Sequence, residues 1–133
     1  MVDAIQTLLP HPIPVHHLGL YREKSTLQPV EYYNNLPQSQ ASSAATTAIL
    51  VDPVIATGGT AIAAIQTLRE WGVKKVIVLN VITAAEGLGR AAEEWSEGTE
   101  FWVGAVDEEL TGSGMIKPGV GDIGDRLYGT IGK

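Results

Sequence analysis

The residues with the clearest chemical potential form one segment near the middle of the chain. An acidic residue is followed by two glycines between two threonines, in the order Asp52-Pro53-Val54-Ile55-Ala56-Thr57-Gly58-Gly59-Thr60. An apolar run precedes this segment and a helical pattern follows it, so the glycines stand where a helix begins. The first amides of a helix have no intrahelical partners and its dipole is positive there, which suits a phosphate group. The segment therefore predicts a phosphate-binding loop, with a plain tight turn as the alternative.

A second segment of this kind lies close to the end of the chain. It is rich in glycine and aspartate and runs Ile116-Lys117-Pro118-Gly119-Val120-Gly121-Asp122-Ile123-Gly124-Asp125-Arg126. Taken alone, this composition is typical of a surface turn.

The elements that must position these segments follow from hydrophobic spacing. Buried strands are predicted at 48–51 and 74–82, and a third strand at 99–106. Helices are predicted at 62–71, ending at Gly72, and at 84–95, where Gly87 and Gly89 weaken the start. Strands that alternate with helices indicate an α/β fold with a parallel sheet and flanking helices. Ligands bind such sheets beyond the carboxyl ends of the strands. In this chain, these positions are residues 52–60 and the loops that follow residues 82 and 106.

The first third of the chain is less regular. A helix is predicted at 2–9, stopped by Pro10 and Pro12. A strand is then expected at 13–21 and an arm or hairpin strand at 28–33, with an exposed connection at 38–47.

Composition limits the classes of function. The 133 residues fit one domain, with 44% apolar and 18% charged residues. A net charge of −6 argues against a nucleic-acid or anionic-membrane surface, and the absence of cysteine excludes disulfides and thiolate metal sites. No stretch is apolar enough for a membrane span and no signal peptide opens the chain, so we expect a cytoplasmic protein. The three histidines lack partners at metal-ligand spacing, and no protein metal site is assigned.

The strand-end aspartate and the glycine loop together resemble the phosphoribosyltransferase family. Asp52 followed by Pro53, the 56–60 loop and the 116–126 tail resemble its uracil-specific branch, whereas most members carry a second acidic residue after the first. The resemblance implies a type I phosphoribosyltransferase-like fold with a β-arm. It also implies the reaction of uracil with phosphoribosyl pyrophosphate to give UMP and pyrophosphate.

Site residues follow from the same resemblance. The whole segment 52–60 would hold phosphoribosyl pyrophosphate, with Asp52 accepting hydrogen bonds from the sugar hydroxyls, and Arg22 would contact the pyrophosphate. Backbone groups of Ile116, Gly121 and Ile123 would read uracil. Asp122 would lie near both substrates and help the uracil nitrogen lose its proton, so that Asp52 and Asp122 are the expected catalytic pair.

The resemblance carries further expectations about ligands and assembly. Magnesium would arrive with the pyrophosphate, held mostly by its oxygens and by water. A homo-oligomer, a dimer or larger, is expected, and GTP is a candidate effector. Glu86 and Gly87 also fit the family pattern.

The resemblance begins in the middle of the family's catalytic domain. An Arg-Ala-Gly element that binds pyrophosphate precedes the matching segment in that family, and this chain has no such element. We therefore expect residues 1–133 to form a single partial domain, truncated at its N-terminus or completed by dimerisation. A non-catalytic nucleotide-binding remnant, or a regulatory or assembly subunit, is the alternative function.

Overall fold

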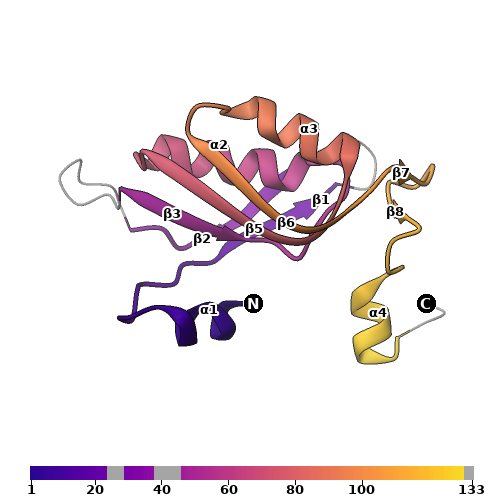
Figure 1. Cartoon of the computed structure of the whole chain (residues 1–133), viewed down its shortest axis with the longest axis horizontal. Helices are drawn as coiled ribbons and strands as arrows, with labels where there is room; N and C mark the ends of the chain where they lie inside the picture. Colours follow the sequence, from indigo (N-terminus) through magenta and orange to yellow (C-terminus); the bar gives the residue numbers. More distant parts are fainter. Residues whose placement is uncertain (24–28, 38–45, 131–133) are drawn as a thin grey trace.

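A parallel β-sheet with two helices on one face forms the centre of the computed structural model, which describes residues 1–23, 29–37 and 46–130. Helices α2 and α3 cover this face, as Figure 1 shows. The strands and helices of this layer are β3 (Thr47–Val51), β4 (Val54–Ile55), α2 (Gly59–Trp71), β5 (Lys75–Ala84), α3 (Ala85–Glu94) and β6 (Thr99–Asp107). The predicted α/β order and the parallel sheet are confirmed.

Strands β3 and β4 both pair with β5 along the same side, separated by a short break. Val51 lies opposite Leu79 and Val54 lies opposite Ile82, so both strands keep the same parallel register. The interruption falls at Asp52 and Pro53. A proline has no amide hydrogen to contribute to a sheet, and the chain turns out of the ladder there.

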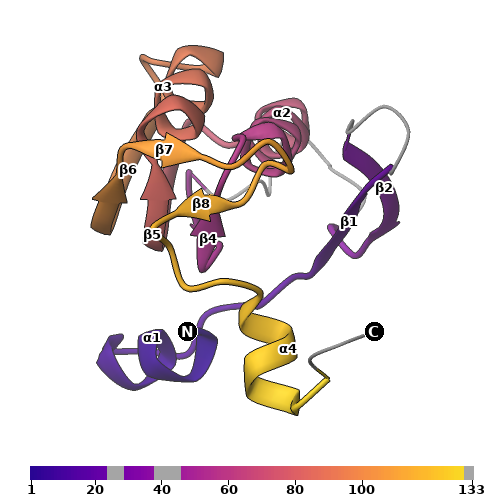
Figure 2. The ribbon, with the colours of Figure 1, turned by 90° about the vertical axis from the view of Figure 1, so that its right-hand side faces the viewer.

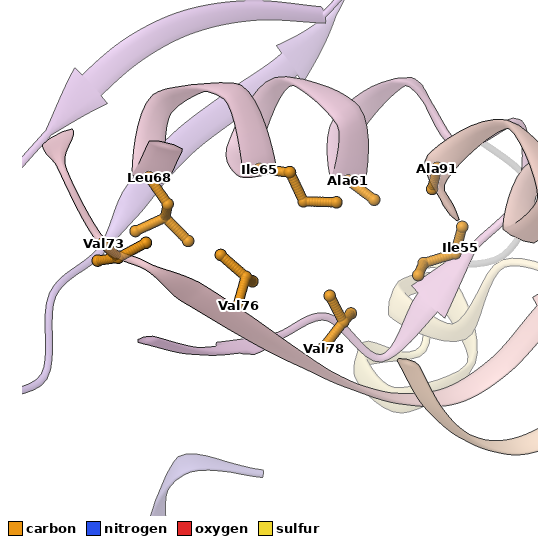
Figure 3. Packing of buried hydrophobic residues seen from close by; sticks show 8 residues of the cluster. All are labelled: Ile55, Ala61, Ile65, Leu68, Val73, Val76, Val78 and Ala91. Atoms are coloured by element: carbon orange, nitrogen blue, oxygen red, sulfur yellow. The ribbon is translucent and has the colours of Figure 1, made fainter. Parts of the chain in front are cut away.

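The core lies between the sheet and α2. Every second residue of β5 faces the helices, so Val76 and Val78 meet Ile65 and Leu68 of α2, as Figure 3 shows. Each such side chain contributes about 1.5–3 kcal/mol when it is fully buried. The helix ends where Gly72 takes the left-handed conformation, at φ 105°, as its sequence predicts.

The N-terminal third adds a helix and a hairpin. These are α1 (Val2–Leu8), β1 (Leu18–Arg22) and β2 (Pro29–Asn34), and the two strands pair antiparallel. The predicted hairpin arm is confirmed, but the strand expected at 13–21 begins only at Leu18. Pro12 and Pro14 explain the delay, because neither can donate to a ladder. Most of the connection predicted at 38–47 lies outside the described residues.

The C-terminal segment contains three short elements that the sequence analysis did not predict. They are β7 (Glu109–Leu110), β8 (Ile116–Lys117) and α4 (Ile123–Tyr128). Strands β7 and β8 form an antiparallel hairpin that follows β6. In Figure 1, α1 and α4 both lie on the opposite side of the sheet from α2 and α3. Among the described residues, no helix combines the length and the apolar character that crossing a membrane requires.

Candidate functional site

The predicted phosphate loop lies between the end of β4 and the start of α2. Gly58 is the N-cap of α2 and takes the left-handed conformation, at φ 84°. Its carbonyl accepts the helical hydrogen bond from Ile62 N at 2.9 Å, while no side chain caps this end of the helix. The amides of the first turn are therefore available to a ligand in the way that a phosphate site requires.

Two buried polar side chains of β5 hold the start of this segment. Asn80 Nδ2 donates to the carbonyl of Asp52 at 2.8 Å, and Thr83 Oγ1 donates to the carbonyl of Ile55 at 2.9 Å. Both side chains belong to nearly fully buried residues. Hydrogen bonds of this kind in a low dielectric are costly to lose, so the break between β3 and β4 has a defined shape.

Helix α3 holds the other end of the segment. Arg90 Nη1 donates to the carbonyl of Thr57 at 3.0 Å. Gly87 packs directly under the loop, and a Cβ added to Gly58 would come within 2.5 Å of the Gly87 carbonyl oxygen. A Cβ on Gly87 would in turn collide with the carbonyl of Ala56. Both glycines are therefore required by a close approach of two backbones.

These contacts share one consequence. The carbonyls of Asp52, Ile55 and Thr57 are bonded to side chains of β5 and α3, which fixes the path of the loop from its inner side. None of Asn80, Thr83 and Arg90 was predicted as a site residue. A signal existed for Asn80, because it is the one polar residue within the apolar run from Val76 to Ile82.

The side chain of Asp52 shapes its own turn. Its Oδ1 accepts a hydrogen bond from Val54 N at 3.3 Å, an arrangement that lets aspartate replace a backbone turn. Asp52 and Thr60 also line the same cavity, of about 810 Å³, which extends along β3. Of the residues that were predicted to act together, the acidic residue and the last residue of the loop thus border the same cavity.

The tail that was predicted to read uracil is held by bonds of its own. Gly119 N donates to Asp107 Oδ2 at 2.9 Å, and Arg126 Nη1 donates to the carbonyl of Val120 at 3.0 Å. Asp122 is the N-cap of α4, and its Oδ1 accepts from Asp125 N at 3.0 Å. This cap gives Asp122 a structural role that the sequence analysis missed, although an aspartate three residues before another acidic residue is a helix-start signal.

The predicted uracil residues are distributed along this tail. Ile116 lies in β8 and is buried, whereas Gly121, Asp122 and Ile123 are exposed around the start of α4. Figure 2 shows β8 beside the β4/β5 end of the sheet, while α4 extends below it. The structure therefore brings the start of the tail to the carboxyl edge where the predicted phosphate loop lies.

The remaining predicted contact is Arg22. It is the last residue of β1 and pairs with Pro29 across the hairpin. In the described ranges, no group of three or more histidine, cysteine, aspartate or glutamate residues is arranged to hold a metal ion.

Comparison with known proteins places this geometry in a family context. The model of the uracil phosphoribosyltransferase family matches residues 1–130. A Schizosaccharomyces pombe protein named for this activity is 50% identical over 129 residues, which are 97% of this chain and 60% of that protein. A Roseiflexus castenholzii uracil phosphoribosyltransferase is 45% identical over 130 residues, which are 98% of this chain and 60% of that enzyme.

A solved structure is similar as well. The AQ2163 protein from Aquifex aeolicus superposes with a TM-score of 0.72 at 41% identity, over 85% of this chain and 52% of that one. The chain thus spans about 60% of the length of the curated relatives that it matches.

Proposed function

Because this chain belongs to the uracil phosphoribosyltransferase family, we propose that it binds phosphoribosyl pyrophosphate and uracil and contributes to forming UMP and pyrophosphate. The proposal rests on the loop at the start of α2, which is held by hydrogen bonds from side chains of other elements. Its carbonyls are bonded on the inner side by Thr83 and Arg90, and this supports a first turn whose amides serve the ribose 5-phosphate.

The roles that we assign to the two aspartates follow from the charges that develop during the reaction. As the bond from the ribose C1 to pyrophosphate breaks, positive charge develops on the sugar ring, and a nearby carboxylate stabilises it. Asp52, at the end of β3, is assigned to the ribose hydroxyls. Asp122 is assigned to the uracil nitrogen, whose proton must leave as the new bond to C1 forms. Backbone groups of Ile116, Gly121 and Ile123 are assigned to the polar edge of the base.

Magnesium fits this proposal as a companion of the substrate. We assign it to pyrophosphate oxygens and water, because Mg²⁺ is usually held by substrate phosphates and keeps several water ligands. When bound there, the ion neutralises charge on the leaving group. Arg22 remains the proposed protein contact for the pyrophosphate.

Substitution of Asp122 by asparagine tests the catalytic assignment. Asparagine caps helices as well as aspartate does, so Asp122→Asn keeps α4 while removing the base. We expect the rate of UMP formation to fall by about 10²- to 10⁴-fold with the circular dichroism spectrum unchanged. A full rate in Asp122→Asn would remove this residue from the chemistry.

A binding subunit without turnover is the second candidate, and the named relatives favour the enzyme over it. Calorimetry with UMP beside a UMP-formation assay on one sample separates the candidates. The enzyme requires both signals, whereas the binding subunit gives heat of binding and no product.

We extend the proposal to assembly, regulation and location. A cytoplasmic homo-oligomer is proposed, and light scattering measures its size. The effect of GTP on the rate of UMP formation tests regulation by this nucleotide.

A further inference from the structure

Asp107 is the last residue of β6 and lies at the carboxyl edge of the sheet, and none of the roles assigned above uses it. Its backbone belongs to the sheet, since it lies opposite Ala84, the last residue of β5. Its side chain is bonded to the C-terminal tail, because Oδ2 accepts from Gly119 N at 2.9 Å. Asp107 thus joins the end of a sheet strand to the segment that is proposed to read the base.

The register of the β7–β8 hairpin explains why a side chain takes this place. Glu109 lies opposite Lys117 at the end of the hairpin ladder. The same register, continued by two residues, places Asp107 opposite Gly119. Pro118 lies between these positions and has no N–H to donate, so the backbone ladder stops before it. The carboxylate of Asp107 therefore accepts the next amide of the tail, in a hydrogen bond that its charge strengthens.

Gly119 is the residue at which the tail bends away from the hairpin. It takes the left-handed conformation, at φ 58°, and a Cβ added there would collide with the carbonyl oxygen of Ile116. The proposed base-reading groups stand on both sides of this bend, with Ile116 before it and Gly121 after it. A hydrogen bond at the bend therefore controls the spacing between groups that must meet one ligand.

The bonds that lie beyond Gly119 are local to the tail. The guanidinium of Arg126 donates to the carbonyl of Val120, and Asp122 caps α4. Bonds of this kind shape the tail without fixing it to the sheet. The bond from Gly119 to Asp107 does fix it, because Asp107 belongs to β6.

We infer that Asp107 is a positioning residue for the base site: by holding the Gly119 amide, it sets the distance between the backbone groups of Ile116 and those around Gly121. When the tail closes on a planar base, groups on both sides of the bend must meet its polar edge together. Asp107 acts through the backbone of the tail and needs no contact with the ligand. The inference rests on the proposed function, since it concerns the affinity of the tail for uracil.

Two ligands separate the base from the phosphate in the test. UMP carries both groups, whereas ribose 5-phosphate lacks the base. We expect Asp107→Ala to raise the dissociation constant of UMP by about tenfold and to leave that of ribose 5-phosphate within about twofold, as measured by calorimetry. An unchanged affinity for UMP, or an equal loss for both ligands in a folded variant, would overturn the inference.

Two further variants show whether the hydrogen bond is the cause. Asp107→Asn keeps a side-chain oxygen that can accept from Gly119 N, so its UMP affinity should stay within about threefold of that of the unmodified chain. Glu109→Ala is the control in the same hairpin, because it removes only an exposed ion pair with Lys117 and should not change UMP affinity. A loss in either variant as large as that in Asp107→Ala would contradict the assignment. If Asp107→Ala does not fold, Asp107→Ser, whose oxygen lies one bond closer to the backbone, replaces it.

Amide exchange at Gly119 tests the same bond without any ligand. We expect it to become about tenfold faster in Asp107→Ala and to change little in Asp107→Asn, with slow exchange at Val76 and Val78 showing an intact core. Equal exchange at Gly119 in the unmodified chain and in Asp107→Ala would overturn the inference. If the unmodified chain binds neither UMP nor ribose 5-phosphate, the proposed function fails, and this measurement still decides whether Asp107 holds the tail.

Discussion

The predicted phosphate loop and the start of the C-terminal tail reach the same edge of the sheet but are held in different ways. The loop is tied by Thr83 and Arg90, which lie about 30 residues away along the chain. The tail is tied by Asp107 and by bonds between Val120 and Arg126 and between Asp122 and Asp125, all within 12 residues. The loop therefore depends on the packed core, whereas the tail depends mainly on its own turns.

This difference suits the two proposed ligands. A phosphate needs amides in fixed positions, because the geometry of several donors must be right at once. A planar base needs a loop that can close over it, and locally held segments open at low cost in free energy. The following substitutions examine this contrast, from the largest expected effect to the smallest.

The first substitution disrupts the close backbone contact between α3 and the predicted phosphate loop. Gly87→Ala pushes a methyl group into the carbonyl of Ala56, so we expect the free energy of unfolding to fall by about 2–3 kcal/mol. Gly89→Ala is the control in the same helix, because nothing lies within 4 Å of its added Cβ. There alanine should stabilise by about 0.5–1 kcal/mol through helix propensity. Urea denaturation measures both, and equal effects would show that the close approach does not matter.

The second substitution compares a buried and an exposed threonine. Thr83→Val leaves the buried carbonyl of Ile55 without its hydroxyl partner, at an expected cost of about 1–2 kcal/mol. Thr111→Val in the β7–β8 connection removes an exposed hydroxyl bonded to Met115 N and should cost less than about 0.5 kcal/mol. Thermal unfolding of the two variants measures the contrast, and a larger loss at Thr111 would reverse our view of the two regions.

The third substitution concerns ligand affinity more than stability. Arg90→Met removes the bond to the carbonyl of Thr57 while keeping an unbranched side chain, and the dissociation constant of UMP should rise by about threefold to tenfold. Arg69→Met is the control, since Arg69 is exposed in the last turn of α2, at the end away from the loop, and lies over the ring of Trp95. Calorimetry should detect no change in UMP affinity for Arg69→Met. Equal losses in both variants would indicate a general effect of charge.

The smallest effect is expected at an exposed ion pair. The pKa of Glu100 lies below its usual value of 4.5, because Lys75 donates a hydrogen bond to it, Trp102 donates another, and the charge of Lys75 attracts it. A lowered pKa in the folded state stabilises above about pH 4.5, and this contribution disappears as the pH falls through the lowered value. Glu100→Gln should therefore lower the melting temperature slightly at pH 7, and the difference should shrink as the pH falls below 4.5. A difference that does not shrink with falling pH would exclude this ion pair as its cause.

Parts of the fold followed from local pattern. Apolar patterns placed β3, β5, β6, α2 and α3. Continuous apolar runs indicated β3 and β5, alternation indicated β6, and apolar residues at helical spacing indicated α2, all of which are properties of neighbouring side chains. The elements that were missed are short. Helix α4 has six residues and β8 has two, and in so few residues no hydrophobic period can be recognised.

By itself, the sequence determined that a glycine loop follows the acidic end of β3 and leads into α2, because an acidic strand end followed by glycines and a helix is a contiguous signal. Only the tertiary structure decided what holds that loop. Thr83 and Arg90 come from other elements, and Gly87 is required by a backbone that is remote in sequence. It also showed which strands lie beside one another: within the described part of the chain, β3 pairs with β5 alone.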